Sequence, residues 1–304
     1  MPLRHSLLAV LVMLVWGGNF VAIDVGVAEV PPLLFVAIRF VLVAFPLVLF
    51  VPRPRGRMRE VVAIGAFMSL GQFTLLYLAL ALGLPSGLAS LLLQAQVVLT
   101  MALAALALGE RPTRRQGVGA LVGSAGLLVV ASARGSADAV LPVVVILGAA
   151  LSWAVGNVVS RRAGISGGLS VVVWSALVVP VPALALSLLV DGPAQVGSAL
   201  SGFSTTAAVS TAYTVYGASL LGYGIWNSLL ARHPAGAVVP FVLLVPPVGL
   251  TCGWVFLGER PSPVELAGAA VALVGVGLAT VTARRRAPRP PVDARPRPVG
   301  AATG

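Results

Sequence analysis

The sequence predicts an all-α membrane protein with ten transmembrane helices, arranged as two inverted five-helix repeats. Its composition is the first reason: of 304 residues, 58% are apolar and 10% are charged, whereas a soluble domain carries about 25% charged residues. The second reason is a series of apolar runs long enough to cross a bilayer. The third is a phrase, LGERP, that occurs at 108–112 and again at 257–261.

Apolar runs of about 20 residues, the length that crosses about 30 Å of hydrocarbon as a helix, recur along the chain. They predict spans at 7–26, 33–51, 61–83, 86–108, 115–133, 139–160, 168–190, 207–231, 235–257 and 264–283. Gly, Pro and Ser inside these runs are compatible with spans, because neighbouring helices satisfy the backbone and small residues allow close contact. The first run lacks a clear small-residue cleavage site, so we expect a retained helix rather than a signal peptide.

The basic residues predict the orientation of the chain. All 20 are arginine, and the net charge is +11. All except Arg39, Arg134 and Arg260 fall on one side if the N-terminus is cytoplasmic, which agrees with the positive-inside rule. We therefore expect a bacterial inner-membrane protein with both termini in the cytoplasm, and these loop arginines do not indicate nucleic-acid binding. The Arg/Pro-rich end at 284–304 is expected to be a disordered cytoplasmic tail.

A constant offset relates the two halves of the chain. The offset between Gly109 and Gly258 also pairs Pro85 with Pro234, Gly87 with Gly236, Gly119 with Gly268 and Gly126 with Gly275. WGGN (16–19) and WAVGN (153–157) are related by a slightly shorter offset, which predicts extra length near 191–206. The expected repeats are 1–136 and 137–283. Because five is an odd number of spans, the second repeat must enter the membrane from the opposite side, as in many secondary transporters.

The phrase LGERP predicts a turn between two helices. Its Gly suits a left-handed helix C-terminus, and its Pro suits the start of the next helix. Glu110 and Glu259 are expected to bond locally or to cap neighbouring helix ends. A gating role for these two carboxylates is the alternative, and the sequence leaves it open.

Polar and aromatic side chains inside the spans are candidates for a substrate pathway, because a polar group in lipid costs free energy unless it meets a partner or water. The candidates are Trp16, Asn19, Arg39, Gln72, Gln94, Gln96, Trp153, Asn157, Tyr216, Tyr223, Trp226 and Asn227. For each amide and phenol, packing between helices is the competing interpretation.

Helical spacing predicts which of these candidates share a face. Asn19 lies one turn beyond Trp16, and Asn157 one turn beyond Trp153, so each pair should face one side. Tyr216, Tyr223 and Asn227 follow a helical stripe in the eighth span.

Gln94 and Gln96 are separated by about 200° on an ideal helix. We therefore expect that both cannot face one cavity.

Arg39 differs from the other candidates because it is charged. An arginine at mid-membrane costs about 2.5–3.5 kcal/mol on insertion scales. Arg39 is expected near the outer end of the second span, where it could snorkel outward, pair with Asp24 or Glu29, or hold a substrate carboxylate.

Several classes of function are not indicated. His5 and His233 stand at the ends of spans, apart from any second metal ligand in the sequence, and Cys252 is the only cysteine. No Walker-type phosphate loop is present, so we expect neither ATP-driven transport nor a cofactor. Neither the converging catalytic groups of an intramembrane enzyme nor the soluble domain of a membrane sensor or scaffold is evident. Proton antiport, facilitated efflux and exchange stay open, as does a homodimer.

Several phrases together resemble the EamA family of the drug/metabolite transporter superfamily: VWGGNFVAIDVG (15–26), PPLLFVAIRF (31–40), SGLASLLLQAQ (86–96), SWAVGNVVSRR (152–162) and LGYGIWNSLLAR (221–232). Within the family they are most similar to exporters of O-acetylserine and cysteine. The resemblance implies a secondary transporter in membrane lipid that exports small amino-acid-like metabolites by alternating access. A multidrug or other metabolite permease is the alternative. Asp24 stands where family members often carry Lys, which bears on the substrate.

Overall fold

The computed structural model describes residues 1–54, 56–133, 137–164 and 168–280; these residues are helical or form short connections, without any strand. Nine helical runs among them are long and apolar enough to cross a membrane: Leu3–Val27, Pro32–Leu49, Met58–Ala81, Ser86–Leu108, Arg114–Ser132, Val140–Ala163, Leu169–Val190, Gly236–Leu257 and Pro263–Thr280. They match nine of the ten predicted spans. The remaining one, expected at 207–231, is helical over Thr205–Arg232 but less apolar, because Thr, Ser, Tyr and Asn interrupt it. The predicted tail at 284–304 lies outside the described residues.

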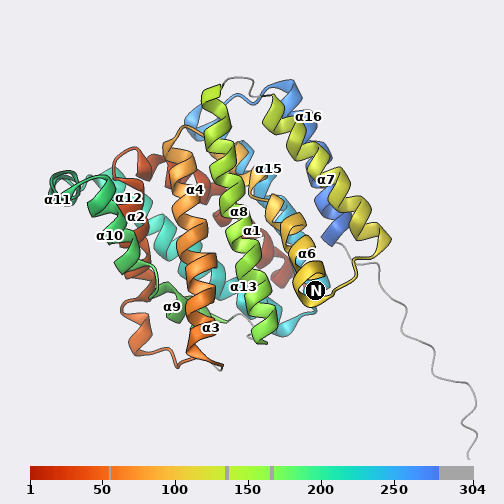
Figure 1. Cartoon of the computed structure of the whole chain (residues 1–304), viewed down its shortest axis with the longest axis horizontal. Coiled ribbons are helices and arrows are strands. Elements are labelled where there is room, and N and C mark those ends of the chain that lie inside the picture. Colours follow the sequence, from red (N-terminus) through yellow and green to blue (C-terminus); the bar gives the residue numbers. More distant parts are fainter. Residues whose placement is uncertain (55, 134–136, 165–167, 281–304) are drawn as a thin grey trace, which may run out of the picture.

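Figure 1 shows the helices as one bundle. Their bounds are α1 Leu3–Val27, α2 Pro32–Ala44, α3 Met58–Ile64, α4 Gln72–Ala81, α5 Ser86–Leu92, α6 Ala95–Leu108, α7 Arg114–Ser132, α8 Ala137–Ala163, α9 Leu169–Ala176, α10 Pro180–Val190, α11 Pro193–Ser201, α12 Thr205–Ala212, α13 Tyr223–Arg232, α14 Ala235–Val238, α15 Val245–Leu257 and α16 Pro263–Thr280. Short 3₁₀ segments occupy Leu47–Leu49 and Val239–Leu244.

Several spans change helix type along their length. The segment between α3 and α4, Gly65–Gly71, is π-helical, and so is the segment between α12 and α13, Tyr213–Gly222. A turn at Leu93 and Gln94 separates α5 from α6. A π-helix has wider turns than an α-helix and often marks a functional site. These segments therefore change the direction of the side chains that follow them.

Helices α7 and α16 pack against each other in opposite directions along a row of glycines. An added Cβ at Gly119 would meet the backbone of Gly275 and Ala279, and one at Gly126 would meet the backbone of Gly268 and Ala272. Residues later in α7 therefore contact residues earlier in α16, so the two helices run antiparallel. Figure 1 shows this pair at one side of the bundle. Only residues without a larger side chain allow so close an approach.

The two LGERP turns have the same backbone conformation. Gly109 ends α6 and Gly258 ends α15, each in the left-handed region with φ 68° and ψ 17°. This confirms the helix C-terminus predicted for the phrase. Since α7 and α16 are antiparallel, the turns that begin them lie at opposite ends of the pair.

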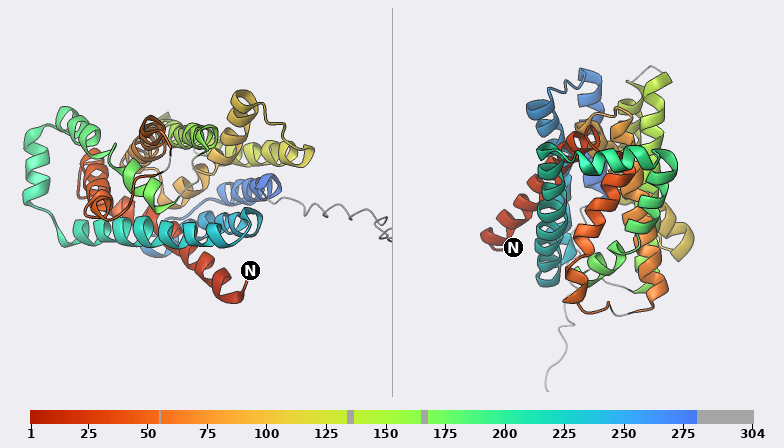
Figure 2. Two further views of the ribbon diagram at one scale, coloured as in Figure 1. Left: turned by 90° about the horizontal axis from the view of Figure 1, so that it is seen from below. Right: turned by 90° about the vertical axis from the view of Figure 1, so that its left-hand side faces the viewer.

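The second half of the chain contains an additional short helix. Helix α11, Pro193–Ser201, occupies the region 191–206, where the offset between the halves predicted extra length. Figure 2 shows it at the edge of the bundle, between α10 and α12.

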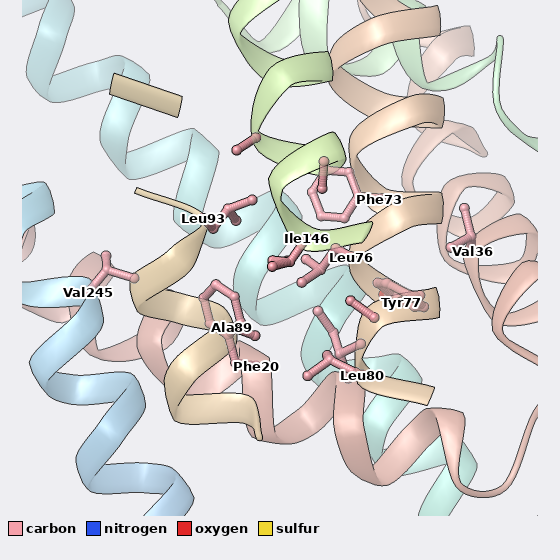
Figure 3. Packing of buried hydrophobic residues seen from close by; sticks show 14 of the residues in the cluster. Phe20, Val36, Phe73, Leu76, Tyr77, Leu80, Ala89, Leu93, Ile146 and Val245 are labelled. Carbon is pink, nitrogen blue, oxygen red and sulfur yellow. The ribbon is translucent and has the colours of Figure 1, made fainter. Parts of the chain in front are cut away.

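The hydrophobic core surrounds α4. Phe73, Leu76, Tyr77 and Leu80 follow one another along this helix and lie near Ile146 of α8 (Figure 3). Tyr77 and Ile146 have no exposed surface. The core fixes α4 against α8 and so positions the polar residues that α4 also carries.

Candidate functional site

A cavity of about 380 Å³ lies between the helices, within the range of about 300–1,000 Å³ that is typical of small-molecule sites. It is lined by all the candidate residues predicted from the sequence except Tyr216 and Asn227, namely Trp16, Asn19, Arg39, Gln72, Gln94, Gln96, Trp153, Asn157, Tyr223 and Trp226. We call this space the central cavity. Its wall combines one cation, five amides and an aromatic cluster.

Trp16 and Asn19 line the central cavity from α1, and Trp153 and Asn157 line it from α8. Each predicted pair therefore shares a face, because both helices are regular at these positions. The Trp16 ring lies 5.1 Å from that of Tyr223 and 5.4 Å from that of Trp226, measured between centroids. These aromatic rings form a wall of the central cavity.

The prediction for Gln94 and Gln96 is wrong: both line the central cavity. The ideal-helix angle fails because Leu93 and Gln94 form a turn between α5 and α6. The backbone N–H of Gln94 donates to Leu91 O at 2.9 Å, and that of Gln96 donates to Leu93 O at 3.1 Å. These hydrogen bonds join residues three apart, as in a 3₁₀-helix, and so tighten the chain relative to an α-helix. The turn brings the two amides to one side.

The prediction of a continuous stripe from Tyr216 to Asn227 is also wrong. Tyr216 is 60% exposed, whereas Tyr223 lines the central cavity. Tyr216 lies inside the π-helical segment, whose wider turns rotate it away from Tyr223. Asn227 lines an adjoining cavity of about 190 Å³, together with Arg39 and Tyr223.

Arg39 is 2% exposed and is held by neutral partners. Its Nη1 donates to the Tyr77 hydroxyl at 3.0 Å, and its Nη2 and Nε donate to Ser219 Oγ at 3.0 and 3.3 Å. The guanidinium lies 4.3 Å from the centroid of the Phe73 ring. Ser219 in turn donates to Thr214 O at 2.8 Å.

These contacts correct two expectations for Arg39. It does not snorkel outward, and within the described ranges no carboxylate, neither Asp24 nor Glu29, forms an ion pair with it. Tyr77 and Ser219, which lie on α4 and on the π-helical segment before α13, were not among the residues predicted from the sequence. Burial of an arginine implies partners of this kind, but only the fold identifies them.

Glu259 caps the start of α5. Its carboxylate accepts from the backbone N–H of Ser86 at 2.6 Å and from that of Gly87 at 3.0 Å. The second LGERP turn is therefore tied to α5, as the capping interpretation predicts.

Glu110 in the first LGERP turn has a different partner. It forms a half-exposed ion pair with Arg161 of α8 at 2.9 Å. Both residues line a third cavity, of about 460 Å³, which shares Gln96, Trp153 and Asn157 with the central cavity. The central cavity thus adjoins a space that reaches the first LGERP turn.

His5 and His233 lie together, although the sequence separates them. His5 Nδ1 and His233 Nε2 are 2.6 Å apart, so one ring donates to the other. Across the described part of the chain, no group of three or more His, Cys, Asp or Glu side chains could hold a metal ion.

A multi-pass helical bundle with a polar and aromatic cavity between its helices is the architecture of a small-molecule membrane transporter. The chain belongs to the EamA-like transporter family, whose model matches residues 3–132 and 140–281. It is therefore a transporter of a family with bacterial members, and not an enzyme.

Relatives of the chain are named as exporters. It is 42% identical to a probable amino-acid metabolite efflux pump of Salmonella typhimurium, over 91% of this chain and 94% of that protein. A protein of the same name from Escherichia coli is 38% identical over 91% and 94%. A probable terminal-alkyne amino-acid exporter of Streptantibioticus cattleyicolor is 31% identical over 92% and 96%.

A crystal structure also resembles the chain, with a TM-score of 0.61 and 24% identity over 93% of this chain and 99% of the other. At this identity the likeness supports the fold alone.

Proposed function

We propose that this protein is a secondary transporter that exports small amino-acid-like metabolites, of the O-acetylserine and cysteine type, by alternating access. The environment of Arg39 is the main support for this proposal. Arg39 is a buried cation on the wall of the central cavity, and it has no ion-pair partner among the described residues. The names of the amino-acid efflux relatives agree with it.

The hydrogen bonds of Arg39 leave room for a carboxylate. A guanidinium has five N–H donors, and Arg39 uses three of them on Tyr77 and Ser219. One N–H remains on each terminal nitrogen. Two parallel N–H donors match the two oxygens of a carboxylate, and a bound carboxylate would neutralise a charge that is costly to bury.

A transport assay tests this function. The purified protein in liposomes is expected to exchange labelled cysteine or O-acetylserine saturably, and more slowly to transport amino acids with larger side chains. A cationic dye should not compete, because Arg39 would repel it. Transport of the dye without any amino acid would support a multidrug permease and overturn the proposal.

We further propose that the two halves, 1–136 and 137–283, are inverted repeats in the inner membrane with both termini cytoplasmic. The antiparallel packing of α7 and α16 supports this. Gly119 contacts Gly275, which is the equivalent of Gly126, and Gly126 contacts Gly268, which is the equivalent of Gly119. The two π-helical segments also lie at matching positions. Exchange of conformation between such repeats produces the two access states.

Cysteine labelling tests the inverted topology. In a Cys252→Ala background, single cysteines at Thr113 and Ser262 report on the two LGERP turns. With an impermeant thiol reagent outside intact cells, Ser262→Cys should react and Thr113→Cys should not. After permeabilisation both should react, which controls for burial. Equal reaction of both in intact cells would exclude inverted repeats.

The two LGERP carboxylates are proposed to alternate as gates. The offset pairs Ser86 and Gly87, which Glu259 caps, with Ala235 and Gly236 at the start of α14. Glu110 instead binds Arg161 beside the third cavity. We assign the described structure to the state in which the central cavity is closed at the Glu259 end and open toward Glu110. In the opposite state, Glu110 caps α14 and Glu259 is released.

A further inference from the structure

Four amide side chains line the central cavity without a hydrogen bond to any other residue in the described ranges: Asn19 of α1, Gln72 of α4, and Gln94 and Gln96 at the α5–α6 junction. Asn19 is 8% and Gln72 is 5% exposed. Asn19 Oδ1, Gln72 Oε1 and Gln96 Oε1 are shielded from solvent and lack a donor. Buried polar groups without partners are rare and need an explanation.

Packing between helices does not explain these amides. Asn157 lies in the same cavity, and its Nδ2 donates to Thr100 Oγ1 of α6 at 3.3 Å, so it has the partner that a packing role requires. Asn19 and Gln72 have no such partner among the described residues. The side-chain oxygens of Asn19 and Gln72 therefore have an unused acceptor in the described structure, and a molecule in the cavity that both residues line could supply the donor.

Gln72 lines the same cavity as Arg39, where the proposed carboxylate site lies. It immediately precedes Phe73, whose ring lies 4.3 Å from the Arg39 guanidinium. Asn19 lies on α1, which packs against α4. Within the described chain, no Asp or Glu lines the central cavity. A ligand ammonium group there must therefore be bound by neutral oxygens, with help from the faces of Trp16 and Trp226.

We propose that Asn19 and Gln72 bind the α-ammonium group of the substrate through their side-chain carbonyl oxygens. This rests on the proposed function, in which Arg39 binds the carboxylate of the same molecule. The two amides then make the site specific for zwitterionic α-amino acids over acids that lack the amine. They are specificity-determining residues, whereas the charge of Arg39 attracts both classes of molecule.

The test compares cysteine with 3-mercaptopropionate, which has the same thiol and carboxylate but no amine. In liposomes the parent protein should transport cysteine at least about tenfold better, the factor expected for hydrogen bonds to a charged group. Asn19→Leu and Gln72→Met, which keep most of the side-chain volume, should raise the KM for cysteine about tenfold and leave that for mercaptopropionate unchanged. The ratio between the two substrates should therefore collapse.

Two further variants separate recognition from folding. Asn19→Ser keeps an oxygen acceptor and should retain more of the discrimination than Asn19→Leu. Asn157→Leu removes an amide that has a partner, and should leave the ratio between the two substrates unchanged whatever its effect on rate. Melting temperature in detergent is measured for every variant.

The outcomes distinguish this inference from the function on which it rests. One outcome is that cysteine transport depends on Arg39 while Asn19→Leu and Gln72→Met reduce the transport of both substrates equally. In that case the proposed ammonium site is wrong, and the proposed export function is unaffected. The same conclusion follows if Asn19→Ser loses as much discrimination as Asn19→Leu. If the parent transports no amino acid, the proposed function fails and takes the ammonium site with it.

Discussion

Replacing Arg39 by Gln is expected to reduce cysteine export by about a hundredfold or more at equal protein level. Hydrogen bonds to a charged group contribute about 1.5–3 kcal/mol each, and the variant removes both the charge and the two free N–H groups. Arg39→Lys keeps the charge and loses the planar fork, so its export should fall between that of Arg39→Gln and that of the parent. Efflux from a cysteine-loaded bacterial host measures all three.

The controls for this prediction follow from the partners of Arg39. Tyr77→Phe and Ser219→Ala each remove a hydroxyl that binds the guanidinium but leave the guanidinium in place. They should lower stability by about 1.5–3 kcal/mol, because each hydroxyl bonds a charged group, and change export less than Arg39→Gln does. Export by Arg39→Gln at the parent's rate would overturn the carboxylate site.

A structural ion pair between Arg39 and Asp24 makes a different prediction. It requires Arg39→Gln to be poorly expressed and Asp24→Asn to restore expression. Because the Arg39 partners in the described structure are hydroxyl groups, we expect no such rescue. Observation of a rescue would show that Arg39 acts through the fold rather than on the substrate.

The sequence predicted those parts of the cavity that depend on regular helix geometry. Trp16 and Asn19 share a face because α1 is an unbroken helix, and Trp153 and Asn157 share one because α8 is regular there. The lengths of the apolar runs correctly predicted nine spans, because length and hydropathy alone decide whether a helix can cross a bilayer. Glycine at Gly109 and Gly258 predicted the two helix ends for the same local reason.

Prediction failed where the backbone departs from an α-helix. Gln94 and Gln96 face one cavity because of a turn, and Tyr216 faces away because of a π-helical segment. Neither change has a signal in helical spacing, which assumes 3.6 residues per turn. Contacts between distant parts of the chain, such as Arg39 with Ser219, depend on the completed fold and leave no local pattern.

The gating proposal predicts effects of opposite sign from two equivalent carboxylates. Ser90 is fully buried and lines the central cavity. A Ser90→Cys probe in a Cys252→Ala background should therefore react with an external impermeant thiol reagent only while the outer end is open. Glu259→Gln weakens the cap that closes this end and should speed the reaction about tenfold or more, the effect of losing about 1.5–3 kcal/mol of charge-assisted bonding.

Glu110→Gln should slow the same reaction. In the described state it breaks only a half-exposed ion pair with Arg161, and such pairs contribute about 0–1 kcal/mol. In the opposite state it weakens the proposed cap on α14, which is a larger loss, so the equilibrium moves toward the described state. Glu29→Gln, at an exposed carboxylate after α1, should leave the rate unchanged. If Glu259→Gln and Glu110→Gln shift the reaction in the same direction, or neither shifts it, the two carboxylates only cap helices and the gating proposal is wrong.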